Sequence, residues 1–280
     1  YEVHPGDIVH IMEDKKGYLW VCSLNQGIFR LNRETQAWDR FSTQPPTKEG
    51  VGALPTNKVV TACLDDKENL WFGTDGQGLL KYNYADETFT KVPLPEDIRV
   101  IQKIIADKND LWITTSNNGM YCYQPGKGSV QPYNKYDGLQ ENQFLPKSGI
   151  RLANGTIFVG GINGFNEFRP ESITHNVRIP TVILAGFQLF NKPVKVGEEG
   201  SPLSTSITYT NQLTLKHQHS IFSLSVATLS YTNPSKNLYR YKLEGFEQDW
   251  TQTHSARHVT YTNLPAGNYT VRVSSSNGDG

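Results

Sequence analysis

The sequence predicts an all-β protein, in which a partial β-propeller of about four blades precedes an immunoglobulin- or fibronectin-III-like β-sandwich. First, a strand pair, clearest at Asp65–Asn83, recurs around Trp20, Trp71, Trp112 and Phe158. Second, these markers lie 51, 41 and 46 residues apart, and periods of about 40 to 50 residues are typical of propeller blades. Third, the pattern changes after the fourth repeat to longer alternating strands, which indicate a sandwich.

Each repeat is predicted to contain four strands joined by polar turns. In the second repeat these strands are Val59–Leu64, Leu70–Gly73, Leu79–Tyr82 and Thr88–Val92. Because the tryptophans occupy one position in three repeats, we expect them to be blade core rather than platforms for stacking sugars. A glycine follows each marker by six or seven residues and permits the positive φ of a tight turn; these glycines are Gly27, Gly78, Gly119 and Gly164.

The repeats end at Arg169–Pro180, where alternation stops and we place a domain boundary. Residues 1–175 are predicted to be propeller blades and residues 180–280 a sandwich. The run Leu264–Tyr269 looks like the tyrosine corner of immunoglobulin-like domains. We expect this sandwich to lack its last strand. Its predicted strands are Val182–Phe190, Ile207–Leu215, Ser220–Ala227, Leu238–Glu244, His258–Thr262 and Asn268–Ser275.

Composition narrows the classes of function. The 27 basic and 27 acidic residues give no net charge, which argues against a protein that binds the phosphates of nucleic acid. The three cysteines, Cys22, Cys63 and Cys122, lie in separate apolar strands, so we expect buried small hydrophobes. No apolar run reaches the roughly 18 residues of a membrane span, and a soluble region is expected.

Several motifs resemble a known family. DKKGYLW and ENLWFGTDGQGLLKYN resemble the two-component regulator propeller repeat, and DGLQENQF, at Asp137–Phe144, with NGTIFVGGINGFNEFRPESI resembles its closing blade. LYRYKLEGFEQDW with HVTYTNLPAGNYTVRV resembles the triple-tyrosine (Y_Y_Y) domain, with Tyr241, Tyr261 and Tyr269 as its naming tyrosines. The resemblance extends over essentially the whole chain. Because the family usually carries propellers with more blades, it implies the C-terminal part of a larger propeller; a closed four-bladed propeller is the alternative.

The resemblance implies the periplasmic part of an inner-membrane sensor histidine kinase from a bacterial hybrid two-component system. Such sensors detect oligosaccharides released from glycans and regulate the genes for polysaccharide utilisation. It also implies an oligosaccharide ligand, a homodimer formed through the Y_Y_Y domain and no cofactor. Nucleic acid is not an expected partner of this region, and the membrane would be reached only through a downstream helix.

Candidate ligand-binding residues lie in the turns between the second and third strands of each repeat and in the links between repeats, which we expect on one face. Amide and carboxylate side chains can bind sugar hydroxyls through paired donors and acceptors, although turn chemistry also explains them. The candidates are Asn25, Gln26, Asp75, Gln77, Asn117, Asn118, Tyr136, Asn142, Gln143 and Asn163.

No catalytic residue and no metal site is predicted. An aspartate near the tryptophan recurs as Asp14, Asp65 and Asp107, so we expect these residues to serve the turn rather than to supply the carboxylate pair of a glycosidase. His217 and His219 lack an evident third ligand for a metal. The sensing region remains the main hypothesis. The alternatives are a structural and dimerising spacer that relays a signal from upstream blades, and a carbohydrate-active propeller enzyme.

Overall fold

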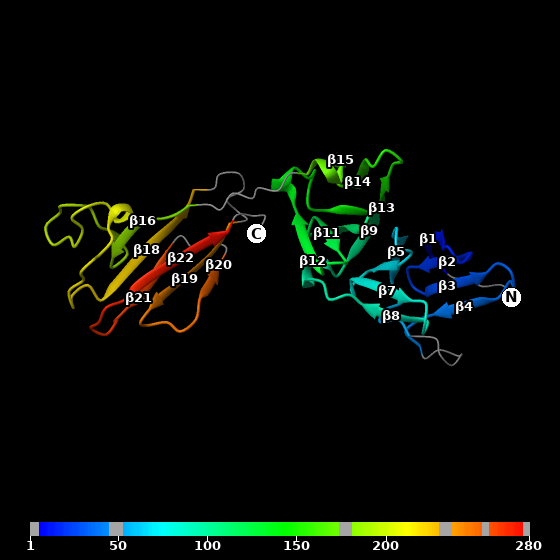
Figure 1. The fold of residues 1–280 in the computed structure, drawn as a ribbon, viewed down its shortest axis with the longest axis horizontal. Helices are drawn as coiled ribbons and strands as arrows, with labels where there is room; N and C mark the ends of the chain where they lie inside the picture. The colour runs from blue at the N-terminus through cyan, green and yellow to red at the C-terminus, as the bar shows by residue number, and fades with distance from the viewer. Residues whose placement is uncertain (1–5, 45–52, 174–180, 230–236, 254–257, 277–280) are drawn as a thin grey trace. The chain divides into compact units, whose positions relative to one another are not determined.

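The computed structural model describes residues 6–44, 53–173, 181–229, 237–253 and 258–276. The chain divides into two compact units, Tyr1–Ile173 and Thr174–Gly280. Both are built from antiparallel sheets with a few short 3₁₀ turns (Figure 1). The predicted boundary segment Arg169–Pro180 is described only as far as Ile173, where it forms the 3₁₀ helix η3 (Pro170–Ser172); its remaining residues lie outside the described part of the chain.

The first unit consists of four consecutive sheets, in which each strand pairs with its neighbour along the chain (Figure 1). The first three sheets have four strands each, and the fourth has three among the described residues. The strands of the first two sheets are β1 (Ile8–Glu13), β2 (Tyr18–Ser23), β3 (Gly27–Asn32), β4 (Trp38–Phe41), β5 (Val59–Leu64), β6 (Leu70–Thr74), β7 (Leu79–Asn83) and β8 (Thr88–Lys91).

The third and fourth sheets follow the same order. Two short 3₁₀ helices, η1 (Glu96–Ile98) and η2 (Lys135–Asp137), lie in the links that lead into them. The strands predicted for the second repeat are confirmed to within one residue at each end. The strands of these sheets are β9 (Ile101–Asp107), β10 (Asp110–Thr115), β11 (Met120–Gln124), β12 (Ser129–Tyr133), β13 (Phe144–Arg151), β14 (Ile157–Gly161) and β15 (Gly164–Phe168).

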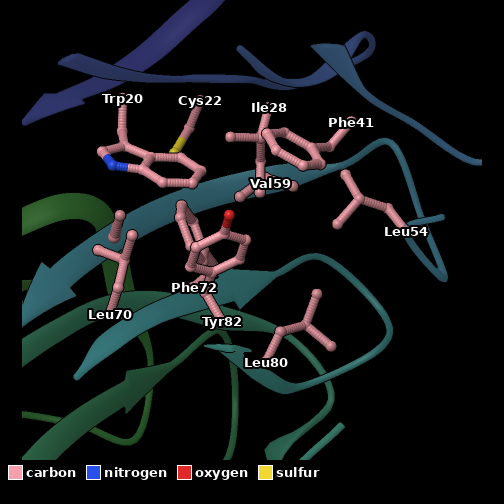
Figure 2. Close-up of a cluster of buried hydrophobic side chains, with 11 residues drawn as sticks. Trp20, Cys22, Ile28, Phe41, Leu54, Val59, Leu70, Phe72, Leu80 and Tyr82 are labelled. Atoms are coloured by element: carbon pink, nitrogen blue, oxygen red, sulfur yellow. The ribbon is translucent and has the colours of Figure 1, made fainter. Parts of the chain in front are cut away.

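The core of the first unit lies between neighbouring sheets. Trp20 and Phe41 from the first sheet pack with Phe72 and Tyr82 from the second, as Figure 2 shows. Trp71 packs in the same way between the second and third sheets, and Trp112 between the third and fourth. All three tryptophans are at most 3% exposed, which confirms that they are blade core. Stacked sheets with aromatic residues between them are the packing expected of propeller blades.

The cysteines follow the same pattern of burial. Cys22 and Cys122 are buried, Cys63 is half-buried, and all three are free thiols. Burial raises the pKa of Cys63 and of Cys122 to about 12. Because the thiolate is the reactive form of cysteine, these side chains act as small hydrophobes.

The second unit is an immunoglobulin-like sandwich of two sheets, with strand orders β17-β16-β18-β21 and β20-β19-β22. Its tyrosine corner is present, because the hydroxyl of Tyr269 donates to the carbonyl of Pro265 at 2.9 Å. Tyr241, Tyr261 and Tyr269 all pack in one hydrophobic core. The strands are β16 (Val182–Leu189), β17 (Lys192–Pro193), β18 (Ile221–Thr228), β19 (Leu238–Glu244), β20 (Thr251–Thr253), β21 (Val259–Thr262) and β22 (Thr270–Ser276).

One predicted strand of the sandwich is wrong. Within Ile207–Leu215 the chain instead forms the 3₁₀ helix η4 (Ile207–Tyr209). The amides of Tyr209 and Thr210 donate to carbonyls three residues earlier, those of Ser206 and Ile207. These local hydrogen bonds replace a strand ladder, while Ile207 still reaches the core. Leu213 and Leu215 also pack against this core, whereas Tyr209 is 81% exposed, so the alternation predicted neither the backbone conformation nor the burial of every apolar residue.

Candidate functional site

The turn between the second and third strands of each sheet lies against the links between sheets. In the first three sheets, a glycine amide at the end of this turn donates to the link that follows: Gly27 to Asn57, Gly78 to Arg99 and Gly119 to Asn142. The start of each turn bonds to the segment that leads into its own sheet, as in the 3.0 Å bond from Asp75 N to the Lys58 carbonyl. Turns and links therefore form one continuous face of the unit.

All ten candidate residues lie on this face, but several of them hold its loops in place. Asn118 Nδ2 donates to the carbonyl of Asp97 at 2.9 Å, and Asn142 Oδ1 accepts from the amide of Lys135 at 2.8 Å. Asn163 Nδ2 donates to the carbonyl of Gln140 at 3.3 Å. The bonds of Asn118 and Asn163 join different loops and that of Asn142 lies within one link, so these side chains stabilise the loops that carry them.

The other candidates have varied surroundings. Gln26 Oε1 accepts from Arg40, and Gln77 Oε1 accepts from Lys91 Nζ at 3.3 Å. Asn25 Nδ2 donates to Asp7 Oδ2 at 3.4 Å. The side chains of Asn117, Tyr136 and Gln143 are exposed, and the Tyr136 ring lies beneath Lys135 Nζ at 5.7 Å.

A cavity of about 320 Å³ opens where the first strands of the four sheets converge. Every sheet of the first unit contributes to its wall, together with the link that precedes β9. The cavity is therefore a property of the whole blade array rather than of one repeat. Its lining residues are Val9, Leu24, Val60, Asp75, Val100, Gln102, Pro146 and Lys147.

A β-bulge in each first strand provides much of this lining. The register of β1 shifts at Val9, that of β5 at Val60 and that of β9 at Gln102. In β13 the shift spans four residues, from Leu145 to Ser148, and includes Pro146 and Lys147. A bulge redirects a side chain out of the alternation of its strand, so the same irregularity in four strands aims four segments at one cavity.

Basic groups gather around the cavity. The pKa of His10 falls to about 4, first because the ring is buried and then because Lys103 and Lys147 are close to it. Burial also lowers the pKa of Lys103. Lys58 lies 3.6 Å from Asp75, so the carboxylate on the wall already has a cationic neighbour. Lys147 has a φ of 62°, a left-handed conformation that is uncommon outside glycine.

Among the ten candidates, Asp75 is the residue found in the cavity lining. Sequence reasoning missed Val9, Val60, Gln102 and Lys147, because it looked at turns and not at first strands. A weak signal was present in polar residues that interrupt otherwise apolar first strands, such as His10 in β1 and Lys103 in β9.

The lining of the cavity contains both apolar and polar side chains. It combines valines with an amide, an amine and one carboxylate, whereas glycoside hydrolysis ordinarily needs a pair of carboxylates. In the described part of the chain, no three His, Cys, Asp or Glu residues are grouped so that they could hold a metal ion. Among the residues that the structure describes, no helix is long and apolar enough to cross a membrane.

Each of the two units contains a segment that matches a known protein family. Residues 53–76 match the two component regulator propeller family, and residues 230–280 match the Y_Y_Y domain family. The chain is 26% identical over 317 residues to histidine kinase P4 of Formosa agariphila, and the alignment covers 95% of this chain and 23% of the kinase. The chain thus spans about a quarter of that relative.

A solved structure has a similar fold. The extracellular domain of the hybrid two component system BT3049 from B. thetaiotaomicron superposes with a TM-score of 0.77 at 22% identity, covering 96% of this chain and 35% of that domain. At this identity the likeness concerns the fold. With the two family matches, it places a segment that matches the two component regulator propeller in the first unit and one that matches the Y_Y_Y domain in the immunoglobulin-like second unit.

Proposed function

We propose that this chain is the extracytoplasmic ligand-sensing region of a hybrid two-component sensor histidine kinase, and that its ligands are oligosaccharides released from glycans. One observation carries the proposal: four sheets converge on a cavity lined by apolar side chains and a few polar groups, as is usual for small-molecule sites. The similarity to a histidine kinase over 95% of the chain supports the class of parent protein.

A ligand in the cavity would contact the first strands of several blades together. It would therefore favour one arrangement of these blades over others, and such a bias can be passed to a distant domain. Coupling free energies of this kind are typically about 1 to 3 kcal/mol. In this proposal the region faces the periplasm and forms a homodimer through its Y_Y_Y domain. Ligand binding changes the spacing of the two Y_Y_Y domains, and a membrane helix downstream of them carries the signal inward.

We also propose that residues 1–175 belong to a larger propeller. In three sheets the marker tryptophan is buried beneath the next sheet. In the fourth sheet its counterpart, Phe158, is only half-buried, and on the same face Ile150 is 58% and Phe165 66% exposed. A further blade packed against this face would bury them.

In the complete parent protein, a cysteine placed at Phe165 should react with a maleimide far more slowly than one at Tyr136. Equal rates would exclude this packing.

Calorimetry tests the sensing proposal directly. The complete extracytoplasmic region of the parent would be titrated with a panel of neutral and acidic glycan oligosaccharides. At least one member should bind, and Val60→Trp, which fills part of the cavity, should weaken that binding. Failure of every oligosaccharide to bind would count against saccharide sensing.

A structural spacer is the second candidate, because nine of the ten predicted contact residues lie outside the cavity lining, and Asn118 and Asn163 bond to other loops. In that case the ligand site lies wholly elsewhere in the parent. The variants Asp75→Lys and Asn118→Lys separate the two functions. The sensing proposal expects Asp75→Lys to alter ligand affinity, while the spacer proposal expects both variants to leave it unchanged.

A further inference from the structure

This inference rests on the proposed sensing function and concerns the chemical class of the ligand. The cavity has a basic side and an apolar side. Lys147 belongs to its lining, and the stem of Lys103, on β9, runs close to Gly149 of β13. In the described residues neither lysine has a salt bridge to a carboxylate.

The carboxylate in the lining does not offset this basic side. Asp75 sits in the turn between β6 and β7, and its nearest cation is Lys58, at 3.6 Å. Because Asp75 pairs with Lys58, it does not neutralise Lys103 or Lys147. The common neighbour of these two lysines is His10. Since like charges gathered near a partly buried space repel one another, an anion placed among them would be favoured.

The opposite side of the cavity is suited to the body of a small molecule. Val9, Val60 and Val100 present methyl groups, and Gln102 adds one amide that can both donate and accept. Pyranose rings have apolar C–H faces and polar edges, which match such a wall. The volume of about 320 Å³ lies near the lower end of the roughly 300 to 1,000 Å³ of ligand pockets, so it suits a single sugar residue better than a long chain.

We infer that the cavity is a binding site for an acidic sugar residue, whose carboxylate or sulfate pairs with Lys147 while its ring rests on the valines of β1, β5 and the link before β9. The longer bulge of β13 makes this possible. It carries Lys147 into the cavity at the point where β1, β5 and β9 each contribute a single bulged residue.

Calorimetry with the whole chain tests the inference with four probes: D-glucuronate, glucose 6-sulfate, glucose and inorganic sulfate. We expect at least one acidic sugar to bind about tenfold or more tightly than glucose, as one charge-assisted hydrogen bond predicts. The two acidic sugars distinguish a carboxylate site from a sulfate site. Lys147→Gln should remove most of the preference for the acid.

Lys108→Gln is the matched control. Lys108 also has a left-handed backbone, with a φ of 54°, and its side chain is 67% exposed in a turn outside the cavity lining. It should leave the affinity unchanged. A second measurement does not depend on the variants: NMR titration should show the pKa of His10 rising when the acidic sugar is bound, because the bound anion stabilises the imidazolium.

Three results would overturn the inference. If glucose bound as tightly as the acidic sugars, the cavity would be a neutral sugar site. The inferred preference for an acidic sugar would then be wrong, while the proposed sensing function would stand. If inorganic sulfate bound and neither acidic sugar did, the cavity would be an ion site. If Lys147→Gln and Lys108→Gln behaved alike while the pKa of His10 stayed fixed, the acid would be bound elsewhere.

Discussion

The indole Nε1 of Trp20 donates a buried hydrogen bond of 2.7 Å to Oδ2 of Asp14. The other oxygen of the same carboxylate accepts from the amides of Lys16 and Tyr18, at 2.9 and 3.0 Å. One aspartate thus closes the turn between two strands and satisfies the polar atom of the residue that anchors the core. The prediction that this aspartate serves the turn is confirmed. The structure also shows its bond to the tryptophan, which was not predicted.

The second sheet repeats the arrangement, and the third does not. Trp71 Nε1 donates to Asp65 Oδ2 at 2.9 Å. In the third sheet the aspartate precedes its tryptophan by five residues rather than six. Asp107 then accepts from Arg151 Nε at 2.6 Å, and Trp112 Nε1 is buried without a hydrogen-bond partner among the described residues.

Removing the carboxylate of Asp65 should destabilise the first unit. Asp65→Ala leaves Trp71 Nε1 and the amides of Lys67 and Asn69 without their acceptor. A buried donor without a partner costs about 1 to 3 kcal/mol, so urea denaturation should show a loss of that size or more. The exposed neighbour offers the control: Asp66→Ala should change the free energy of unfolding by less than about 0.5 kcal/mol. Equal effects of the two variants would refute the role assigned to Asp65.

Two tryptophans in equivalent positions should respond differently to the same substitution. Trp71→Phe removes packing and a hydrogen bond, whereas Trp112→Phe removes packing and a polar atom that has no partner. We expect Trp71→Phe to cost about 1 kcal/mol more, the usual net value of one hydrogen bond. Denaturation monitored by circular dichroism compares them. A greater loss in Trp112→Phe would contradict the difference in bonding.

Arg30 joins the first two sheets through a nearly buried network. Its guanidinium donates to Tyr82 Oη at 2.8 Å and lies 2.7 Å from carboxylate oxygens of both Asp39 and Glu87. Arg30→Met should lower the free energy of unfolding by about 3 kcal/mol, because breaking a buried ion pair leaves a charge without its partner. Arg33→Met removes an exposed pair with Glu13 and should cost at most about 1 kcal/mol. Similar losses in both variants would exclude a special role for Arg30.

The stability of the first unit should fall as pH drops from about 6.5 to about 4. The pKa of His10 is lowered from 6.5 to about 4 in the fold, chiefly by burial. In that interval the unfolded chain binds a proton that the folded chain does not, so acid favours unfolding. His10→Gln should weaken this dependence, measured as urea midpoints at several pH values between 4 and 7. Parallel curves for the two proteins would show that His10 does not contribute.

Much of the fold could be predicted from local patterns. The strands of the second repeat follow from Leu70–Gly73 and Leu79–Tyr82, because two apolar runs flanked by polar, glycine-containing turns leave few alternatives. The tyrosine corner also follows from a short motif, and Tyr269 makes the bond to Pro265 that the motif predicts. The run Ile207–Leu215 marks the limit, since apolar residues at alternate positions do not by themselves specify a strand ladder.

The candidate site was much less predictable. The prediction that the turns lie on the same face as the links is confirmed, because a turn and the next link are joined by hydrogen bonds such as that from Gly119 N to the Asn142 carbonyl. Some of their amides, however, bond to the carbonyls of neighbouring loops instead. Asp75 reaches the cavity because its turn adjoins the first strands, a relation between sheets that no single repeat contains.

The sequence by itself determined the periodic strands and the tryptophan core. These features depend on contacts within one repeat or between successive repeats. The tertiary structure alone decided that Gln102 and Lys147 line a cavity. A bulge exists only where two paired strands differ in residue count, and a cavity exists only where four such strands meet.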